Sequence, residues 1–274
     1  MAATKNKIFL YLSFPLTILV AISAYCGIFI DGTYAGETEN WRVQGIGQDL
    51  FDLFIIVPAL IISGIFAYQN KKIAFFTFGG AVLFLVYSYA IYCFALHFNY
   101  LFLVYCLTFG LSVYSFVWFT AAHSANVVKT WFDSHVPVKL LAFILIFIAV
   151  LFYFLWLSEI IPAIMQHKTP KSLIGTGMLT NPVQVLDISL LLPGMIITSI
   201  FLLKRKPVGY LLTPVALVFC VLMSANIAGL AIFMKLKGMS DSLMIAEIMG
   251  IFVVFGLILL YVLFGHLKKA SISL

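Results

Sequence analysis

Long apolar runs alternate with short polar breaks along this chain, and that pattern limits the folds open to it. The apolar runs predict eight helices, at residues 8–30, 50–68, 74–96, 100–123, 140–165, 188–203, 209–234 and 243–265. A helix needs about 20 apolar residues to cross the roughly 30 Å of bilayer hydrocarbon. Strands of a membrane β-barrel would instead alternate in polarity over about ten residues, which these runs do not do. We therefore predict an all-α polytopic membrane protein with eight transmembrane helices.

The composition excludes several classes of function. Hydrophobic residues make up 64% of the chain and charged residues only 9%, whereas soluble domains carry about a quarter charged residues. The net charge of +6 comes without a basic stripe or nucleic-acid motif, so we expect membrane lipid and no nucleic acid as the surroundings. The four cysteines show no CxxC spacing, and phosphate-loop, zinc-protease and nucleophile-elbow motifs are absent. We expect no metal, no cofactor and no catalytic residues.

The basic residues predict the orientation of the chain. With the N-terminus inside, eleven of the sixteen Lys and Arg fall on the inner side, as the positive-inside rule demands. The first apolar run is too long for the core of a secretory signal, so we interpret it as a retained helix. We therefore expect an integral protein of the bacterial inner membrane with both termini in the cytoplasm.

A shift of 135 residues aligns the chain with itself. Asp52-Leu-Phe-Ile-Ile-Val-Pro58 then lies over Asp187-Ile-Ser-Leu-Leu-Leu-Pro193, and Lys71 falls on Lys206. An offset of four helices preserves direction, so we predict a parallel repeat of the kind that some transporters use. The repeats would be residues 1–136 and 137–274, within a single membrane domain. The alternative is convergent composition of neighbouring apolar helices.

Acidic residues supply the first candidate site residues. Only Asp133 lies on the predicted inner side, and the other nine acids lie outside or in the outer half of a helix. Asp49, Asp52 and Asp187 stand near the outer starts of their helices, and small residues that mark helix contacts share the faces of Asp52 and Asp187. We predict that these aspartates face the bundle interior. The alternative is that they are first-turn acids, stabilised by the helix dipole.

Five further residues complete the predicted ligand- or ion-binding set. Glu159 and Glu247 lie inside predicted helices, where acids usually face a cavity or a partner, unless they reach the headgroups. Asn226 could bond to them or make an ordinary interhelical contact. Tyr89 and Tyr92 suit a pocket for an amphipathic or cationic ligand, or an interfacial aromatic belt.

Two resemblances add to these observations. The stretch from Gly45-Ile-Gly-Gln-Asp49 through His97-Phe-Asn99 to Phe102 resembles uncharacterised multi-pass bacterial membrane proteins. The acid-x5-Pro spacing at Asp52 and Asp187 is similar to a helix of the EXPERA family, four-helix proteins whose cavities bind sterols and amphipathic amines through paired acids. That resemblance implies that Asp52 and Glu159 are ligand-binding acids. The first predicted helix, 8–30, departs from the family pattern because it contains no acid.

Together these features favour a non-ATP-driven transporter or channel-like carrier. Its outward-facing acidic cavity would bind a small cation, a proton or an amphipathic base. One alternative is an EXPERA-like intramembrane lipid-binding protein or lipid enzyme. The other is a non-catalytic membrane assembly or sensory partner. The sequence leaves the oligomeric state open.

Overall fold

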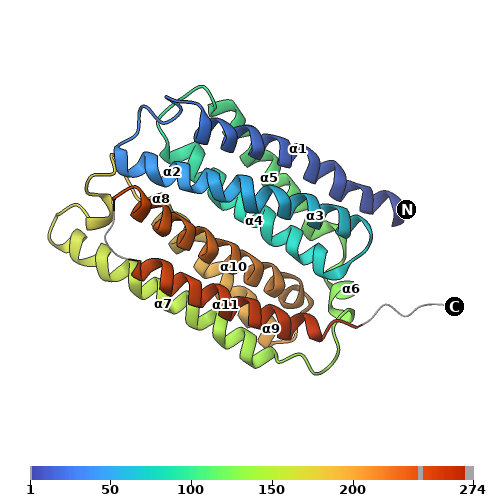
Figure 1. Cartoon of the computed structure of the whole chain (residues 1–274). Helices are drawn as coiled ribbons and strands as arrows, with labels where there is room; N and C mark the ends of the chain where they lie inside the picture. Colours follow the sequence, from blue (N-terminus) through green and yellow to red (C-terminus); the bar gives the residue numbers. More distant parts are fainter. Residues whose placement is uncertain (1, 240–242, 269–274) are drawn as a thin grey trace.

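The computed structural model describes residues 2–239 and 243–268, and within them it is all-helical. Figure 1 shows the long helices running side by side in one bundle. Eight of them are long and apolar enough to cross a membrane, which confirms the predicted fold class and is consistent with an integral membrane protein. The elements are α1 (Ala2–Phe29), α2 (Glu39–Phe51), η1 (Asp52–Ile56), α3 (Val57–Tyr68), α4 (Lys72–Ala95), α5 (Phe102–Ala122), α6 (Ala125–Thr130), α7 (Val138–Met165), η2 (Lys171–Leu173), α8 (Pro182–Leu186), η3 (Asp187–Leu191), α9 (Leu192–Leu203), α10 (Pro207–Leu236) and α11 (Met244–Gly265).

Two spans begin earlier than their apolar runs. The second starts at Glu39 rather than at residue 50, because the Thr38 side chain caps it by accepting a hydrogen bond from the Trp41 amide. The sixth starts at Pro182 rather than at residue 188, because the Asn181 side chain accepts from the first amides and proline suits the first helical position. Asp49 and Asp52 consequently lie well inside a continuous span, and the first-turn explanation does not apply to them.

Both early-starting spans contain a five-residue π-helical segment that begins at an aspartate. The segments are η1, which begins at Asp52 and precedes Pro58, and η3, which begins at Asp187 and precedes Pro193. Proline donates no hydrogen bond and clashes with the carbonyl four residues before it, so a wider turn relieves the helix there. The acid-x5-Pro spacing thus has the same backbone form in both places. The parallel superposition of the two halves stays a prediction.

Helix α4 is the central element of the bundle. In its most apolar stretch 72% of the residues are buried, whereas the corresponding share is 22% in α7 and in α11. Helix α4 packs on α3, α5 and α10. Gly80 permits the close approach of α10, because a Cβ there would collide with Val218. Helix α7 packs mainly on α9 and α11 mainly on α10, which leaves each of them at the periphery.

The start of α1 and the finish of α11 lie at the same end of the bundle (Figure 1). We call this the termini end, and we call the opposite end, with the connections 30–38, 96–101 and 166–181, the distal end. At the termini end Phe132 and Leu267 form an isolated antiparallel bridge. Asp133 next to it is hydrogen-bonded to the His135 amide and to the His266 ring, and these bonds lower the pKa of its carboxyl group.

Candidate ligand-binding cavity

A cavity of about 800 Å³ lies among α2, α4, α7, η3, α9, α10 and α11. Most of its wall is apolar, with Phe152 from α7 and Phe252 and Phe255 from α11 among the large side chains. Since α7 and α11 pack mainly on different helices, the cavity occupies the space between two peripheral helices. A space of this size and polarity matches the usual cavities for small organic ligands, which measure about 300–1,000 Å³.

Polar side chains enter the cavity wall near the distal ends of their helices. They come from five different spans and include Trp41, Gln44, Gln48, Tyr87, Tyr92, Trp156, Asp187 and Asn226. An apolar chamber with a few polar groups at one end suits a molecule with an apolar body and a polar head. Asp187 is the only carboxylate among the lining residues.

Asp187 is held in place by two aromatic donors. Its carboxylate accepts hydrogen bonds from the Tyr87 hydroxyl at 2.9 Å and from the Trp156 indole nitrogen at 2.8 Å. No lysine, arginine or histidine forms an ion pair with it in the described part of the chain. A carboxylate offers about four lone-pair positions, so Asp187 retains the capacity to accept a hydrogen bond from a ligand.

Asp49 lies in a closed pocket of tyrosines. It is fully buried and accepts hydrogen bonds from the hydroxyls of Tyr34 at 2.6 Å and Tyr92 at 2.7 Å. Gly27 of α1 faces it, where any Cβ would overlap the carboxylate. Burial raises the pKa of the Tyr34 hydroxyl well above its usual range, and the nearby Asp49 adds to the effect. Each oxygen of Asp49 thus has a donor from its own chain, and Gly27 and the tyrosines close its pocket.

Asp52 is fully buried but only half satisfied. One of its oxygens accepts from the Gln48 amide at 2.9 Å, whereas Oδ2 has no hydrogen-bond partner. The Gln48 carbonyl oxygen in turn accepts from the Asn226 amide at 2.5 Å. Tyr89 stacks on Tyr92 with ring centroids 5.1 Å apart, and its hydroxyl also lacks a hydrogen-bond partner.

The two predicted glutamates do not join the aspartates in one acidic cavity. Glu159 holds the 166–181 connection, since it accepts hydrogen bonds from the Ser172 amide at 2.6 Å and the Gln184 side chain at 2.9 Å. Glu247 is exposed in the first turn of α11. Neither lines the cavity, and neither does Asp52. The structure does not bring Asp52 and Glu159 together in this cavity, and their pairing in one ligand site, which the EXPERA resemblance implied, stays a prediction.

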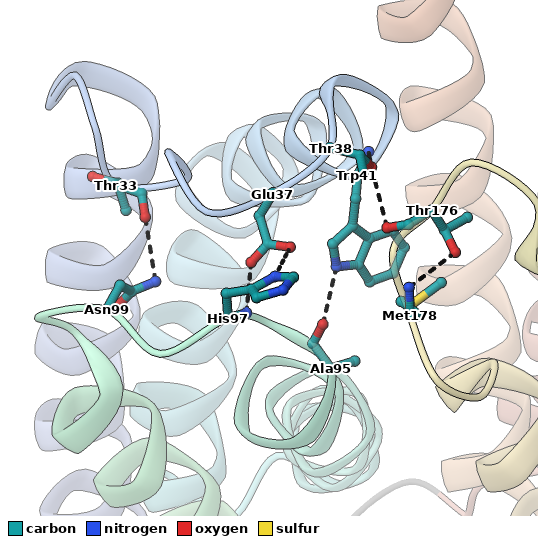
Figure 2. Close-up of polar contacts among 9 residues, drawn as sticks. All are labelled: Thr33, Glu37, Thr38, Trp41, Ala95, His97, Asn99, Thr176 and Met178. Carbon is teal, nitrogen blue, oxygen red and sulfur yellow. Dashed lines mark hydrogen bonds and ion pairs between the residues drawn. The ribbon is translucent and has the colours of Figure 1, made fainter.

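Hydrogen bonds between loops cross the distal end of the bundle. Figure 2 shows Trp41 donating to the Ala95 carbonyl, Thr38 donating to the Thr176 carbonyl, and the Glu37 carboxylate contacting the backbone and ring of His97. Because Trp41 also lines the cavity, these contacts fix one part of its wall.

Several residues of the cavity were missed by the sequence analysis, notably Trp41, Tyr87 and Trp156. Their aromatic character is common to much of the chain, so composition alone gave no signal. Comparison of the chain with family models, with curated proteins and with solved structures finds no match. The case for a function therefore rests on the site itself.

Proposed function

We propose that this protein is a non-ATP-driven membrane carrier that binds an amphipathic base in the cavity between α7 and α11. The observation that carries the proposal is the placement of Asp187 in the wall of an otherwise apolar cavity. The apolar body of a ligand would occupy the chamber, and its protonated amine would meet the carboxylate. Trp156 and Tyr87 already hold that carboxylate in position, so little ordering is needed when the ligand binds.

The aromatic residues support a cationic rather than a neutral head. Trp41, Tyr87 and Trp156 all line the cavity, and the face of an indole or phenol ring attracts an ammonium group. The described residues provide no ion-pair partner for Asp187. A ligand amine would supply the missing positive charge, which a buried carboxylate requires.

Binding is tested with the purified protein in lipid nanodiscs. The probes are a dansyl-labelled alkylamine and the alcohol with the same dansyl and alkyl groups. We expect tighter binding of the amine, and Asp187→Asn should weaken it at least about tenfold, the lower bound for a hydrogen bond to a charged group. Glu39→Gln, at an exposed acid outside the cavity, is the matched control. Equal binding of the two probes, unaffected by Asp187→Asn, would refute the proposed ligand class.

Transport is tested separately in liposomes. Uptake of a radiolabelled amphipathic amine should occur without ATP and should fall with Asp187→Asn. Binding without any protein-dependent uptake would refute the carrier part of the proposal. The protein would then be an intramembrane binding protein and not a carrier.

A further inference from the structure

A second site lies behind the cavity wall, where three buried oxygen atoms lack hydrogen-bond partners. They are Oδ2 of Asp52, the hydroxyl of Ser23 and the hydroxyl of Tyr89. All three residues are fully buried, with no exposed surface. Buried polar atoms are rarely left unsatisfied in native proteins, so three of them in one region point to a bound species.

These atoms belong to elements that meet at one place in the bundle. Helix α1 packs on α2 and η1. The Tyr89 hydroxyl of α4 lies near Asp52 and near the Ser23 hydroxyl, but the two hydroxyls do not reach the geometry of an ordinary hydrogen bond with each other. Ser23 also lies one helical turn before Gly27, the residue that faces Asp49. Asp52 and Ser23 are therefore on the facing sides of the same helix pair.

Among the described residues, no positively charged group faces Asp52. The ionisable groups that face it are Asp49, one turn earlier on its own helix, and Tyr89 and Tyr92 on α4. Gln48 donates one hydrogen bond, and Ser23 on α1 is uncharged. Burying a carboxylate beside a second one is unfavourable without a counter-charge. A water molecule would satisfy the hydroxyls but would leave an ionised Asp52 without a counter-charge. The carboxyl group would then have to carry its own proton, and the Na⁺ titration below distinguishes a bound cation from that protonated acid.

We propose that Asp52, Ser23 and Tyr89 form a binding site for a small monovalent cation, and that Na⁺ is the ion it takes. Carboxylate and hydroxyl oxygens suit a hard cation, and the closed position favours a small one. The site stands at the start of the π-helical segment η1. Irregular helical backbone that lines a sodium site is a known arrangement in transporters.

The site has a polar connection to the cavity. Because a carboxylate oxygen only accepts, the Gln48 amide must present its nitrogen to Asp52 and its oxygen to Asn226. This arrangement leaves the Asn226 side-chain oxygen without a hydrogen-bond partner. Gln48 and Asn226 both line the cavity. Their two side chains therefore connect the cavity to the proposed cation site.

The test is thermal unfolding of the full chain in nanodiscs, titrated with NaCl at constant ionic strength against choline chloride. A ligand that binds only the folded state raises Tm with the logarithm of its concentration. We expect a rise of about 3 °C or more by about 100 mM NaCl, and no rise with Asp52→Asn. Ser23→Ala and Tyr89→Phe each remove one oxygen and should need about tenfold more Na⁺ for the same shift.

The variants Ser23→Ala and Tyr89→Phe decide the question if Asp52→Asn does not fold. Asp187→Asn, in the separate cavity, should keep the full sodium response. Equal Tm curves in NaCl and choline chloride, or an unchanged response in Ser23→Ala and Tyr89→Phe, would refute the cation site. An equal rise in KCl would refute Na⁺ as the ion that it selects. A sodium response that fails while amine binding persists refutes this inference alone, and the reverse result refutes only the proposed function.

Discussion

Replacing Gly27 by alanine tests the contact between α1 and the buried carboxylate of Asp49. An ideal Cβ at residue 27 would overlap the carboxylate, with Cγ of Asp49 at 2.7 Å and the Tyr34 hydroxyl at 2.9 Å. Asp49 is fully buried and accepts from Tyr34 and Tyr92, so it cannot move aside without losing at least one of these bonds.

The expected cost follows from these contacts. Overpacking a filled interior costs about 1–3 kcal/mol, and the loss of one hydrogen bond to a charged group about 1.5–3 kcal/mol. The better helix propensity of alanine returns up to about 1 kcal/mol. Gly27→Ala should therefore destabilise the protein by about 1.5–6 kcal/mol.

The measurement is equilibrium unfolding in mixed micelles by titration with sodium dodecyl sulfate, followed by tryptophan fluorescence. Gly110→Ala is the matched control, since a Cβ there meets no atom within 4 Å and should stabilise α5 slightly. In the Gly27→Ala background, Asp49→Ala should lower the free energy of unfolding by less than it does in the wild type. The reason is that Asp49→Ala also removes the carboxylate with which the new Cβ clashes. If Gly27→Ala unfolds like Gly110→Ala, the placement of Asp49 against α1 is wrong.

Three further predictions concern other parts of the chain. Glu159→Gln should make the 166–181 connection more susceptible to limited proteolysis, because it weakens the bonds to the Ser172 amide and to Gln184; an unchanged cleavage rate would contradict this role. Asp133 has a lowered pKa in the folded state, so its stabilising contribution should be present above about pH 4 and lost as pH falls through the lowered value. That acid-dependent loss should be absent from the unfolding curves of Asp133→Asn. In intact cells without native cysteines, a cysteine at Glu39 should react with an impermeant thiol reagent and one at Gln69 should not; labelling at Gln69 alone would reverse the predicted orientation.

The spans were predictable because hydropathy depends only on neighbouring residues. All eight predicted runs correspond to long apolar helices. The early start of α2 was not predictable in this way, because Glu39–Phe51 is a polar segment overall. Its helix depends on the Thr38 cap and on packing that brings Gly47 against Phe233 of α10. A hydropathy pattern reports neither the cap nor the packing.

The candidate site was predictable only in part. The acid-x5-Pro spacing identified Asp52 and Asp187, and both prove to be buried in π-helical segments. Tyr34, the partner of Asp49, comes from a loop, and Trp156, the partner of Asp187, comes from a different helix. Which helix faces meet is a property of the whole bundle. Glu159 was misjudged because a glutamate inside a long helix resembles a cavity acid, whereas this one binds the loop that follows the helix.

The two aspartates share a backbone setting but differ in what they contact, and this difference makes a measurable prediction about coupling. Asp187 faces the cavity with two donors in place, whereas Asp52 lies behind the wall with one donor, Gln48. Gln48 and Asn226 belong both to that wall and to the hydrogen-bonded chain that ends on Asp52. A cation at Oδ2 of Asp52 would draw negative charge away from Oδ1 and weaken the hydrogen bond that Gln48 donates there. It would thereby change the polarity that the cavity ligand meets.

Linkage requires this effect to be reciprocal. The factor by which saturating Na⁺ changes the affinity for the dansyl amine must equal the factor by which the amine changes the affinity for Na⁺. A coupling of about 1–3 kcal/mol corresponds to a factor of roughly 5–150. Gln48→Leu keeps a side chain of similar size but removes both polar atoms of the amide. Each ligand should therefore still bind, while the coupling factor falls towards unity. Undiminished coupling in Gln48→Leu would refute this route, because no other side-chain hydrogen bond of the described residues joins Asp52 to the cavity wall.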